Sequence, residues 1–336
     1  MKAMVLEGKK KIELKDVEKP TPGLNDVIVR IKATSVCGTD LHLYQGLLPA
    51  KVPMVLGHEA SGEIAEVGAN VKSVKVGDKV YIDPILACGE CRLCRTGRYN
   101  VCENRRVIGH DIAEGTFCEY VRVPETNVFP IPKTMSFEEA ALMETTSVAV
   151  HAVKRARINM GDNVAILGAG PIGLLAIQAA KIAGAGATIV TEIQPNRMKL
   201  ADELGADEVI DASKGDVEKK IMELTNGVGP EVVMEVIGRP DTVEQAIRLV
   251  RKGGRVVVVG LTTIPAKLEI LLLSRRELEI IGSNAYMMKV ERVGELVGSG
   301  KINVKPLITH RMPLEKLPEA LGLLERNEGI KMMLEP

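Results

Sequence analysis

Four cysteines near one another have the spacing of a metal site. Two, two and seven residues separate them, and they are Cys88, Cys91, Cys94 and Cys102. Four thiolates at this spacing can surround one tetrahedral zinc ion and leave no position open for a substrate, so the pattern predicts a structural zinc. Four unligated thiols or an iron–sulfur cluster are the alternatives, but nothing else in the sequence indicates electron transfer.

A second set of possible metal ligands mixes three kinds of donor atom. Cys37 offers a sulfur, His58 an imidazole nitrogen, and Glu59 and Glu144 offer carboxylate oxygens. A zinc ion held by such a mixture can keep one position open for water or an alcohol oxygen, which it polarises as a Lewis acid. The spacing of twenty-one residues between Cys37 and His58 means little alone, because a histidine packed in a core is the commoner outcome. The convergence of several donors favours a catalytic zinc.

A glycine-rich segment with the pattern G-x-G-x-x-G follows an apolar run and precedes a predicted helix, which is the context of a dinucleotide-binding loop. The first glycine permits a tight turn, the second lets a pyrophosphate approach the backbone, and the third lets the helix pack close to the strand. The helix N-terminus then supplies amide donors to the phosphates. The candidate cofactor-binding residues of this loop are Gly168, Gly170, Pro171, Ile172 and Gly173.

An acidic residue ends the next predicted strand and bears on the choice of cofactor. Glu192 lies nineteen residues past Gly173, where a carboxylate accepts hydrogen bonds from the ribose hydroxyls and repels a 2′-phosphate. Arg197 could accommodate such a phosphate, or it could lie against the adenine; Glu192 could also be a solvated strand end. We predict NAD. Leu261 and Ser283, which end two later predicted strands, are further candidate cofactor contacts.

The elements that must position these residues change in kind along the chain. Residues 1–147 contain many short β-type runs separated by Gly and Pro, such as 27–34 and 78–86, and predict a mostly antiparallel β domain. Ser136 and Glu139 form a capping-box pattern that opens one helix with the sequence AALMETTSVAVHAVKRA.

Beyond that helix, apolar runs alternate with helical stretches. The predicted strands cover 163–168, 187–192, 207–212, 231–238, 255–261 and 278–283. Strands that are apolar throughout and alternate with helices indicate a parallel sheet covered on both faces. The fold class is therefore α/β, with a doubly wound Rossmann sheet beside the β domain. After Gly282 the pattern returns to helix and short strands, which we expect to rejoin the first domain.

Length and charge narrow the class of protein. At 336 residues the chain exceeds the usual size of one core, so two domains are expected. Lys plus Arg and Asp plus Glu number 44 each, and this neutrality argues against nucleic acid or a membrane surface as a partner. No apolar run is long enough to span a bilayer, and the N-terminus lacks the apolar stretch of a signal peptide. A cytoplasmic location is expected.

Five segments together carry a resemblance to a known family. They are VCGTD, PMVLGHEASG, the four-cysteine lobe, ALMETTSVAVHA and GAGPIG. In this order they resemble the zinc-containing medium-chain alcohol dehydrogenases, and GRYN and SVAVHA resemble the polyol (sorbitol) branch, with threonine dehydrogenases as near neighbours. The resemblance implies a GroES-like catalytic domain over 1–147 with a structural zinc lobe at 86–104, an NAD-binding Rossmann domain over 148–284, and a return to the catalytic domain over 285–336.

The resemblance also implies a role for each candidate ligand. Cys37 and His58 bind the catalytic zinc, with Glu59 as the third ligand. Glu144 occupies the position where other alcohol dehydrogenases place a cysteine ligand, so it either binds zinc directly or holds the zinc-bound water. Asp40 is expected to accept a hydrogen bond from the zinc-bound imidazole; the alternative is a turn-forming residue at a helix start.

A reaction follows from these parts. Zinc lowers the pKa of a substrate hydroxyl so that an alkoxide forms near neutral pH. Thr39 can accept the proton and pass it to His42, which lies three residues along and nearer solvent. The alkoxide carbon then gives hydride to the nicotinamide of NAD.

Three departures from the family pattern bear on the substrate. Polyol dehydrogenases usually carry an Arg-Tyr pair where this chain has Ala285 and Tyr286, so Tyr286 stays a candidate substrate contact and the arginine is missing. A threonine dehydrogenase should also need a cation for the substrate carboxylate, and Arg292 belongs to the next predicted helix. Thr145 replaces the proline that usually follows the glutamate, so the loop under the zinc is expected to differ in shape.

We therefore predict an NAD- and zinc-dependent dehydrogenase of a secondary alcohol, diol or sorbitol-like polyol. L-threonine 3-dehydrogenase is the alternative within the enzyme class, and a non-catalytic zinc- and nucleotide-binding protein is the alternative from another class. The resemblance suggests a homotetramer, and the strand at 255–261 is one candidate edge for subunit pairing; the sequence leaves dimer and tetramer open.

Overall fold

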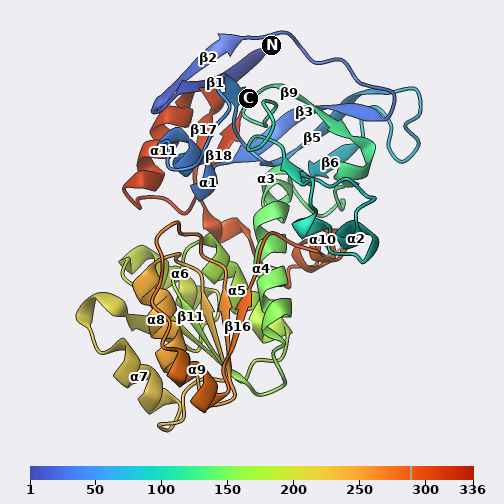
Figure 1. Ribbon diagram of the computed structural model, residues 1–336. Helices are drawn as coiled ribbons and strands as arrows, with labels where there is room; N and C mark the ends of the chain where they lie inside the picture. Colours follow the sequence, from blue (N-terminus) through green and yellow to red (C-terminus); the bar gives the residue numbers. More distant parts are fainter. Residues whose placement is uncertain (288–289) are drawn as a thin grey trace. The chain divides into compact units, whose positions relative to one another are not determined.

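The computed structural model describes residues 1–287 and 290–336 (Figure 1). Their contacts divide the chain into two compact units, each formed from more than one segment. The first unit comprises Met1–Thr145, Met287–Gly300 and Val304–Pro336. The second comprises Thr146–Tyr286 and Lys301–Asn303.

The first unit is built on a seven-stranded sheet, in which β17 and β18 pair in parallel and every other pair is antiparallel. The order is β10-β6-β5-β3-β18-β17, and β9 also pairs with β3. The strands are β3 (Asp26–Ser35), β5 (Glu59–Val67), β6 (Lys79–Ile82), β9 (Tyr120–Pro124), β10 (Val128–Pro130), β17 (Ile308–Pro313) and β18 (Lys331–Glu335). The end of the chain thus completes a sheet that its beginning forms, and the predicted antiparallel β character is confirmed.

Smaller elements surround this sheet. The remaining strands are β1 (Lys2–Gly8), β2 (Lys11–Asp16), β4 (Met54–Val55), β7 (Ile85–Leu86) and β8 (Arg106–Val107). The helices are α1 (Gly38–Tyr44), α2 (Arg92–Arg95), α3 (Phe137–Ala141), α10 (Val290–Gly298) and α11 (Leu317–Glu325). One core lies around β3, where Val27, Val29 and Ile31 are buried together, and a second packs α11 against Leu56 and Phe117.

Two sequence-based boundaries in this unit are wrong. The run 78–86, expected as one strand, divides into β6 and β7 because the chain turns at Asp83 and Pro84, and proline has no N–H for a ladder. The helix expected after Ser136 is two helices, α3 and α4 (Met143–Ala156), separated where Leu142 ends the first. The predicted capping box itself is present, with the Ser136 N–H donating to Glu139 at 2.9 Å and the Glu139 N–H donating to Ser136 at 3.2 Å.

The second unit is a six-stranded sheet in which all strands are parallel, in the order β13-β12-β11-β14-β15-β16. The strands are β11 (Asn163–Leu167), β12 (Ala187–Glu192), β13 (Glu208–Asp211), β14 (Val232–Glu235), β15 (Arg255–Val258) and β16 (Glu279–Gly282). Its further helices are α5 (Pro171–Ile182), α6 (Pro195–Glu203), α7 (Val217–Leu224), α8 (Pro240–Leu249) and α9 (Ile270–Arg276). The strand order reverses beside β11, where such sheets bind ligands.

Alternate residues of β11 face opposite layers of helices. Ala165 and Leu167 share a buried cluster with Val243 and Ile247 of α8, while Ile166 points to the other face. Helices α7 and α8 lie on one side of the strands and α4 on the other (Figure 1). The predicted doubly wound parallel sheet is confirmed. The expectation that the strand at 255–261 forms an edge is wrong, because β15 pairs with both β14 and β16.

Candidate active site and metal sites

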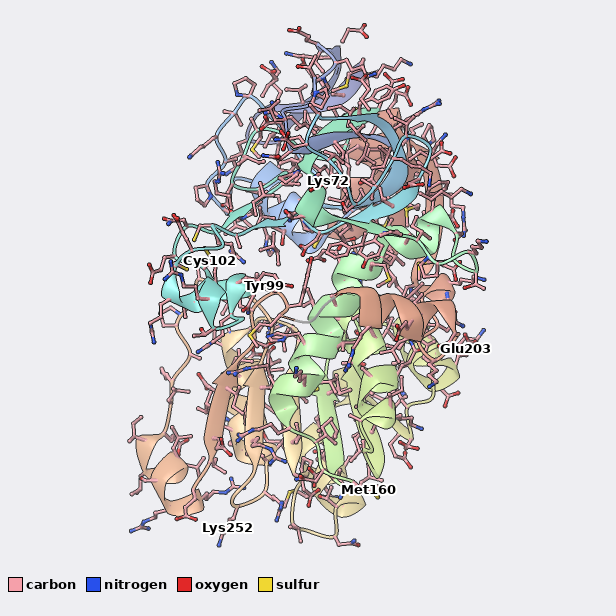
Figure 2. The ribbon with its side chains drawn as sticks, turned by 90° about the vertical axis from the view of Figure 1, so that its right-hand side faces the viewer. Lys72, Tyr99, Cys102, Met160, Glu203 and Lys252 are labelled. Carbon is pink, nitrogen blue, oxygen red and sulfur yellow. The ribbon has the colours of Figure 1, made fainter. Side chains whose placement is uncertain are left out.

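The four sulfurs of the cysteine lobe lie at the separations that one zinc ion requires. All four Sγ atoms are within 4.8 Å of one another. Sγ–Sγ distances are 3.9 Å for Cys88–Cys94, 3.9 Å for Cys91–Cys102 and 3.4 Å for Cys88–Cys102. Tetrahedral zinc with Zn–S bonds of about 2.3 Å separates its sulfurs by about 3.8 Å. The lobe therefore fits zinc with little rearrangement. In Figure 2 the labels of Cys102 and Tyr99 mark this lobe, beside α2.

Backbone amides donate hydrogen bonds to three of these four sulfurs. The N–H groups of Cys91, Cys94 and Asn104 donate to Sγ atoms of Cys88, Cys91 and Cys102 at 3.4, 3.5 and 3.3 Å. The donation from Cys94 lowers the pKa of the Cys91 thiol to about 6, which favours the thiolate that binds metal. All six cysteines are free of disulfide bonds, so the four thiols are available to a metal.

Strand pairing brings the mixed ligand set together in the first unit. Ser35 at the end of β3 pairs with Glu59 at the start of β5. Cys37 follows β3 by two residues, and His58 directly precedes β5, so both lie beside this pair. One ligand atom from each of Cys37, His58 and Glu59 falls within 4.8 Å of the others. A sulfur, a nitrogen and a carboxylate oxygen at this range fit a zinc ion with an open position.

Asp40 ties together the two segments that carry ligands. Its buried carboxylate accepts hydrogen bonds from the N–H groups of Cys37 at 2.9 Å and Gly57 at 3.1 Å. His58 Nδ1 lies 3.4 Å from Asp40 Oδ1, which is an ion-pair contact longer than a hydrogen bond. The structure thus gives Asp40 backbone partners that the sequence did not suggest, next to the imidazole that it was expected to orient.

Lys331, which no sequence pattern singled out, makes an ion pair inside the candidate zinc site. Its Nζ atom lies 2.5 Å from both carboxylate oxygens of Glu59, and the two side chains are 2% and 1% exposed. Thr145 donates a third hydrogen bond to Glu59 Oε1 at 2.7 Å. One signal in the sequence could have found it: Lys331 begins an apolar run near the chain end, which predicts a buried position. A buried lysine requires an acidic partner.

Charges and burial shift the titration of this cluster. Burial raises the pKa of Glu59, but the charges of Lys331 and His58 outweigh it and hold that pKa below its usual value. Burial lowers the pKa of the His58 imidazole, but the charges of Asp40 and Cys37 raise it well above its usual value. The neighbouring charges therefore favour the charged form of both groups.

Other predicted site residues lie near this cluster without joining the group of three. Glu144 is in the first turn of α4, and burial raises its pKa to about 7, with the charge of His58 opposing the shift and that of Glu59 adding to it. Its carboxylate is outside the set whose ligand atoms meet within 4.8 Å. Thr39 and His42 lie three residues apart on α1. The roles of all three residues stay predictions.

The glycine loop in the second unit has the geometry of a pyrophosphate cradle. Gly168 has a φ of +105°, which favours glycine, and a Cβ on Gly173 would lie 2.0 Å from the Gly168 carbonyl oxygen. A Cβ on Gly170 would meet nothing within 4 Å, so space lies open in front of the loop. Pro171 begins α5, whose N-terminal amides point into that space. The loop therefore fits a dinucleotide.

Glu192 lies at the end of β12 and is 7% exposed. Its carboxylate accepts hydrogen bonds from the N–H groups of Ala169 at 2.9 Å, Ile193 at 2.7 Å and Gln194 at 3.0 Å. These bonds fix an acidic group directly beside the glycine loop. Arg197 lies in the first turn of α6. The alternative that Glu192 is a solvated strand end does not fit this burial.

Three further candidate contacts occupy different surroundings in the second unit. Leu261 follows β15 and is 67% exposed, and its backbone packs against Gly238. Ser283 follows β16 and is buried. Tyr286 is completely buried. Their roles stay predictions.

Comparisons with known proteins cover the whole chain. Residues 23–133 match the alcohol dehydrogenase GroES-like domain, and residues 171–299 match the zinc-binding dehydrogenase model. The chain is 36% identical to the sorbitol dehydrogenase of Bacillus subtilis over 345 residues, which cover 100% of this chain and 97% of that protein. It is 39% identical to the L-threonine 3-dehydrogenase of Pyrococcus abyssi over 331 residues, or 96% and 94% of the two chains.

A solved structure agrees with these matches. It is a candidate zinc-binding dehydrogenase from Sinorhizobium meliloti bound to NADP, with a TM-score of 0.95 and 36% identity over 100% of this chain and 99% of that one. The GroES-like and Rossmann architecture inferred from the sequence motifs is confirmed.

Proposed function

The chain belongs to the zinc-containing medium-chain alcohol dehydrogenase family, and from this premise we propose that it transfers hydride from a secondary alcohol, diol or sorbitol-like polyol to NAD. The observation that carries the proposal is the convergence of Cys37, His58 and Glu59 within 4.8 Å at the meeting of β3 and β5. When bound, zinc polarises the substrate hydroxyl and NAD accepts the hydride.

The chain's own residues hold the site and move the proton. Cys37 and His58 would bind the catalytic zinc with Glu59 or Glu144. Asp40 accepts hydrogen bonds from the backbone N–H groups of Cys37 and of Gly57, which directly precedes His58. Thr39 Oγ1 would take the proton of the substrate hydroxyl. His42, one turn along α1 and partly exposed, would hand that proton to solvent.

The second metal site has a structural role in this proposal. A zinc held by the four cysteines would have no open position, and it would fix the loop that they span. We assign the catalytic function to residues 1–147 and 285–336, with the zinc lobe at 86–104, and the NAD-binding function to 148–284. The separation of the contact units near Thr145 and Tyr286 supports this division.

The cofactor assignment rests on Glu192. Its buried carboxylate beside the glycine loop would repel the 2′-phosphate of NADP and accept hydrogen bonds from the ribose of NAD. The relative from Sinorhizobium meliloti was solved with NADP, so direct comparison is needed. We expect kcat/KM to favour NAD, and a preference for NADP would overturn the assignment.

The substrate assignment rests on charge. Ala285 stands where polyol dehydrogenases usually carry an arginine, and a threonine substrate would need a cation for its carboxylate. The similarity to a threonine 3-dehydrogenase nevertheless favours L-threonine as the second candidate. Substrate-dependent NADH formation should be measured with sorbitol, xylitol, inositol, butanediol and threonine. Turnover of threonine alone would reverse the assignment, and two bound zinc ions with no turnover would support a non-catalytic protein.

We also propose a cytoplasmic homotetramer. No helix in the described part of the chain could span a membrane. Exposed apolar side chains gather along the segment that precedes and forms the edge strand β16, and such a patch is typical of a subunit interface. They are Ile264, Leu268, Ile270, Leu271 and Ile280. Light scattering of the purified protein should give the mass of four chains, and a monomer would contradict this proposal.

A further inference from the structure

Lys331 is the buried charge that the proposed mechanism does not use. Both Glu59 oxygens lie 2.5 Å from its Nζ atom, and each side chain is almost fully buried. Burial lowers the pKa of its ammonium group, but the charges of Glu59, Cys37 and Glu144 hold that pKa above its usual value. Lys331 therefore directly contacts one proposed zinc ligand, Glu59, and lies close to two others, Cys37 and Glu144.

The central sheet explains how the last strand reaches this place. Ser35 of β3 pairs with Glu59 of β5 on one side and with Met333 of β18 on the other. The N–H of Val36 donates to the Met332 carbonyl at 3.0 Å, which extends the β18 pairing towards Cys37. Lys331 is two residues from Met333 and shares its face of the sheet, so it lies across from the ligands.

Thr145 completes the environment of Glu59 in a way that departs from the family pattern. Members of the family usually have a proline here, which has no side-chain donor, whereas Thr145 Oγ1 lies 2.7 Å from Glu59 Oε1. Glu59 Oε1 thus receives two hydrogen bonds and Oε2 receives one. A carboxylate oxygen has about two lone-pair sites. Oε2 is the oxygen with capacity left for a metal.

Electrostatics make Lys331 and zinc alternatives for the same carboxylate. A buried carboxylate without a partner is strongly disfavoured, so some cation must stand beside Glu59. In this structure that cation is Lys331. A zinc ion bound to Glu59 would add two positive charges near the ammonium group, and the two cations would repel each other in a site of low dielectric constant.

We propose that Lys331, assisted by Thr145, is a positioning residue that holds Glu59 in place in the metal-free protein and weakens the binding of the catalytic zinc by competing for it. The inference rests on the proposed function, because it requires zinc at Cys37 and His58. On this proposal the site stays folded without metal, and the bond between Glu59 and the metal stays exchangeable.

Zinc affinity tests the proposal independently of activity. The zinc dissociation constant of the catalytic site is measured by competition with a chromogenic chelator for the wild type, Lys331→Met and Thr145→Val. Removal of the ammonium group should tighten binding by about tenfold or more, and removal of the hydroxyl by about threefold. Arg311→Met is the matched control, since Arg311 on β17 pairs with Glu138 at the surface. Its affinity should stay within about twofold of the wild type.

Thermal unfolding after removal of the catalytic zinc supplies the second measurement. Lys331→Met should lower the unfolding temperature of the depleted protein more than that of the zinc-loaded protein, because zinc can replace the missing cation. Adding Glu59→Gln to this variant should restore most of the loss, since the unpaired carboxylate is gone.

The outcomes separate the two proposals. Affinity of Lys331→Met equal to or weaker than that of the wild type, with two zinc ions in the wild type, would overturn the role of Lys331 alone. If Lys331→Met fails to fold, Thr145→Val decides, and unchanged or weaker zinc binding by it would overturn the competition. A wild type with one zinc ion, unchanged by Cys37→Ser, would instead refute the proposed function.

Discussion

The two zinc sites are built in opposite ways. The sulfurs of the cysteine lobe come from one short loop, and backbone N–H groups point at them. The mixed site draws on the ends of two strands, and charged side chains complete it: Asp40 on one side and Lys331, from the far end of the chain, on the other. In our proposal the metal of the first, local site supports folding, whereas the second site carries its own internal cation and can stay folded without metal.

The largest expected difference between the sites is in catalysis. Cys37→Ser removes a ligand of the mixed site, so turnover should fall by about 10³-fold or more, because the polarising metal is lost. Zinc content measured by atomic emission should fall from two ions to one per chain. The unfolding temperature should change little, because Lys331 still compensates Glu59. Near-normal turnover would show that the mixed site is not catalytic.

The corresponding change in the lobe should affect stability instead. Cys88→Ser breaks a closed site whose metal contributes to folding, so the unfolding temperature should fall by about 10 °C. Calorimetry of the variant and of Cys118→Ser provides the comparison, because Cys118 is a buried thiol outside both metal sites. If Cys88→Ser and Cys118→Ser lowered the temperature equally, the lobe would not be a zinc-stabilised element.

A third change tests whether the mixed site moves protons through α1. Thr39→Val keeps the shape of the side chain and removes the hydroxyl, so the hydride-transfer rate should fall by about 100-fold. Single-turnover formation of NADH checks this, with zinc content expected to stay at two ions. An unchanged rate would exclude the proton path through Thr39 and His42.

The smallest expected effect concerns His151, a buried titratable group that lacks, among the described residues, an ion pair such as the one between Glu59 and Lys331. His151 on α4 is 2% exposed, and its Nδ1 atom has no hydrogen-bond partner. Burial, with the charges of Arg155 and Lys154, lowers its pKa to about 4. The unfolded chain takes up a proton near pH 6.5 and the folded chain does not, so stability should fall as the pH drops from 6.5 towards 4.

With allowance for solvent screening, the loss should be about 1 kcal/mol between pH 7 and pH 5. Denaturant unfolding of the wild type and His151→Gln at both pH values measures it. The variant should lose less stability than the wild type over this interval. Equal losses in both proteins would show that His151 is not responsible.

The sequence predicted what depends on local pattern. The cysteine spacing, the glycine loop, the cap at Ser136 and the alternating strands and helices each depend on neighbouring residues, and the structure has all of them. The predicted boundaries of elements were wrong where a single residue breaks a strand, as Pro84 does between β6 and β7. The pattern of apolar residues does not reveal such a turn inside an apolar run.

Non-local pairing explains the rest of what was missed. Nothing near Lys331 in sequence shows that β18 will join β3, so its partner Glu59 could not be identified. Likewise, apolarity alone could not tell that β15 is interior and β16 is the edge, since both strands contain consecutive apolar residues. Thr145 was noted only as a departure from the family; its bond to Glu59 needed the fold.

Anomalous diffraction at the zinc absorption edge, from crystals grown with NAD, tests the central claim most directly. The account predicts two peaks per chain, one among the four lobe sulfurs and one bonded to Cys37 and His58. NAD should lie along the glycine loop, with its ribose hydroxyls at Glu192. A single peak, confined to the cysteine lobe of a crystal with NAD bound, would contradict it.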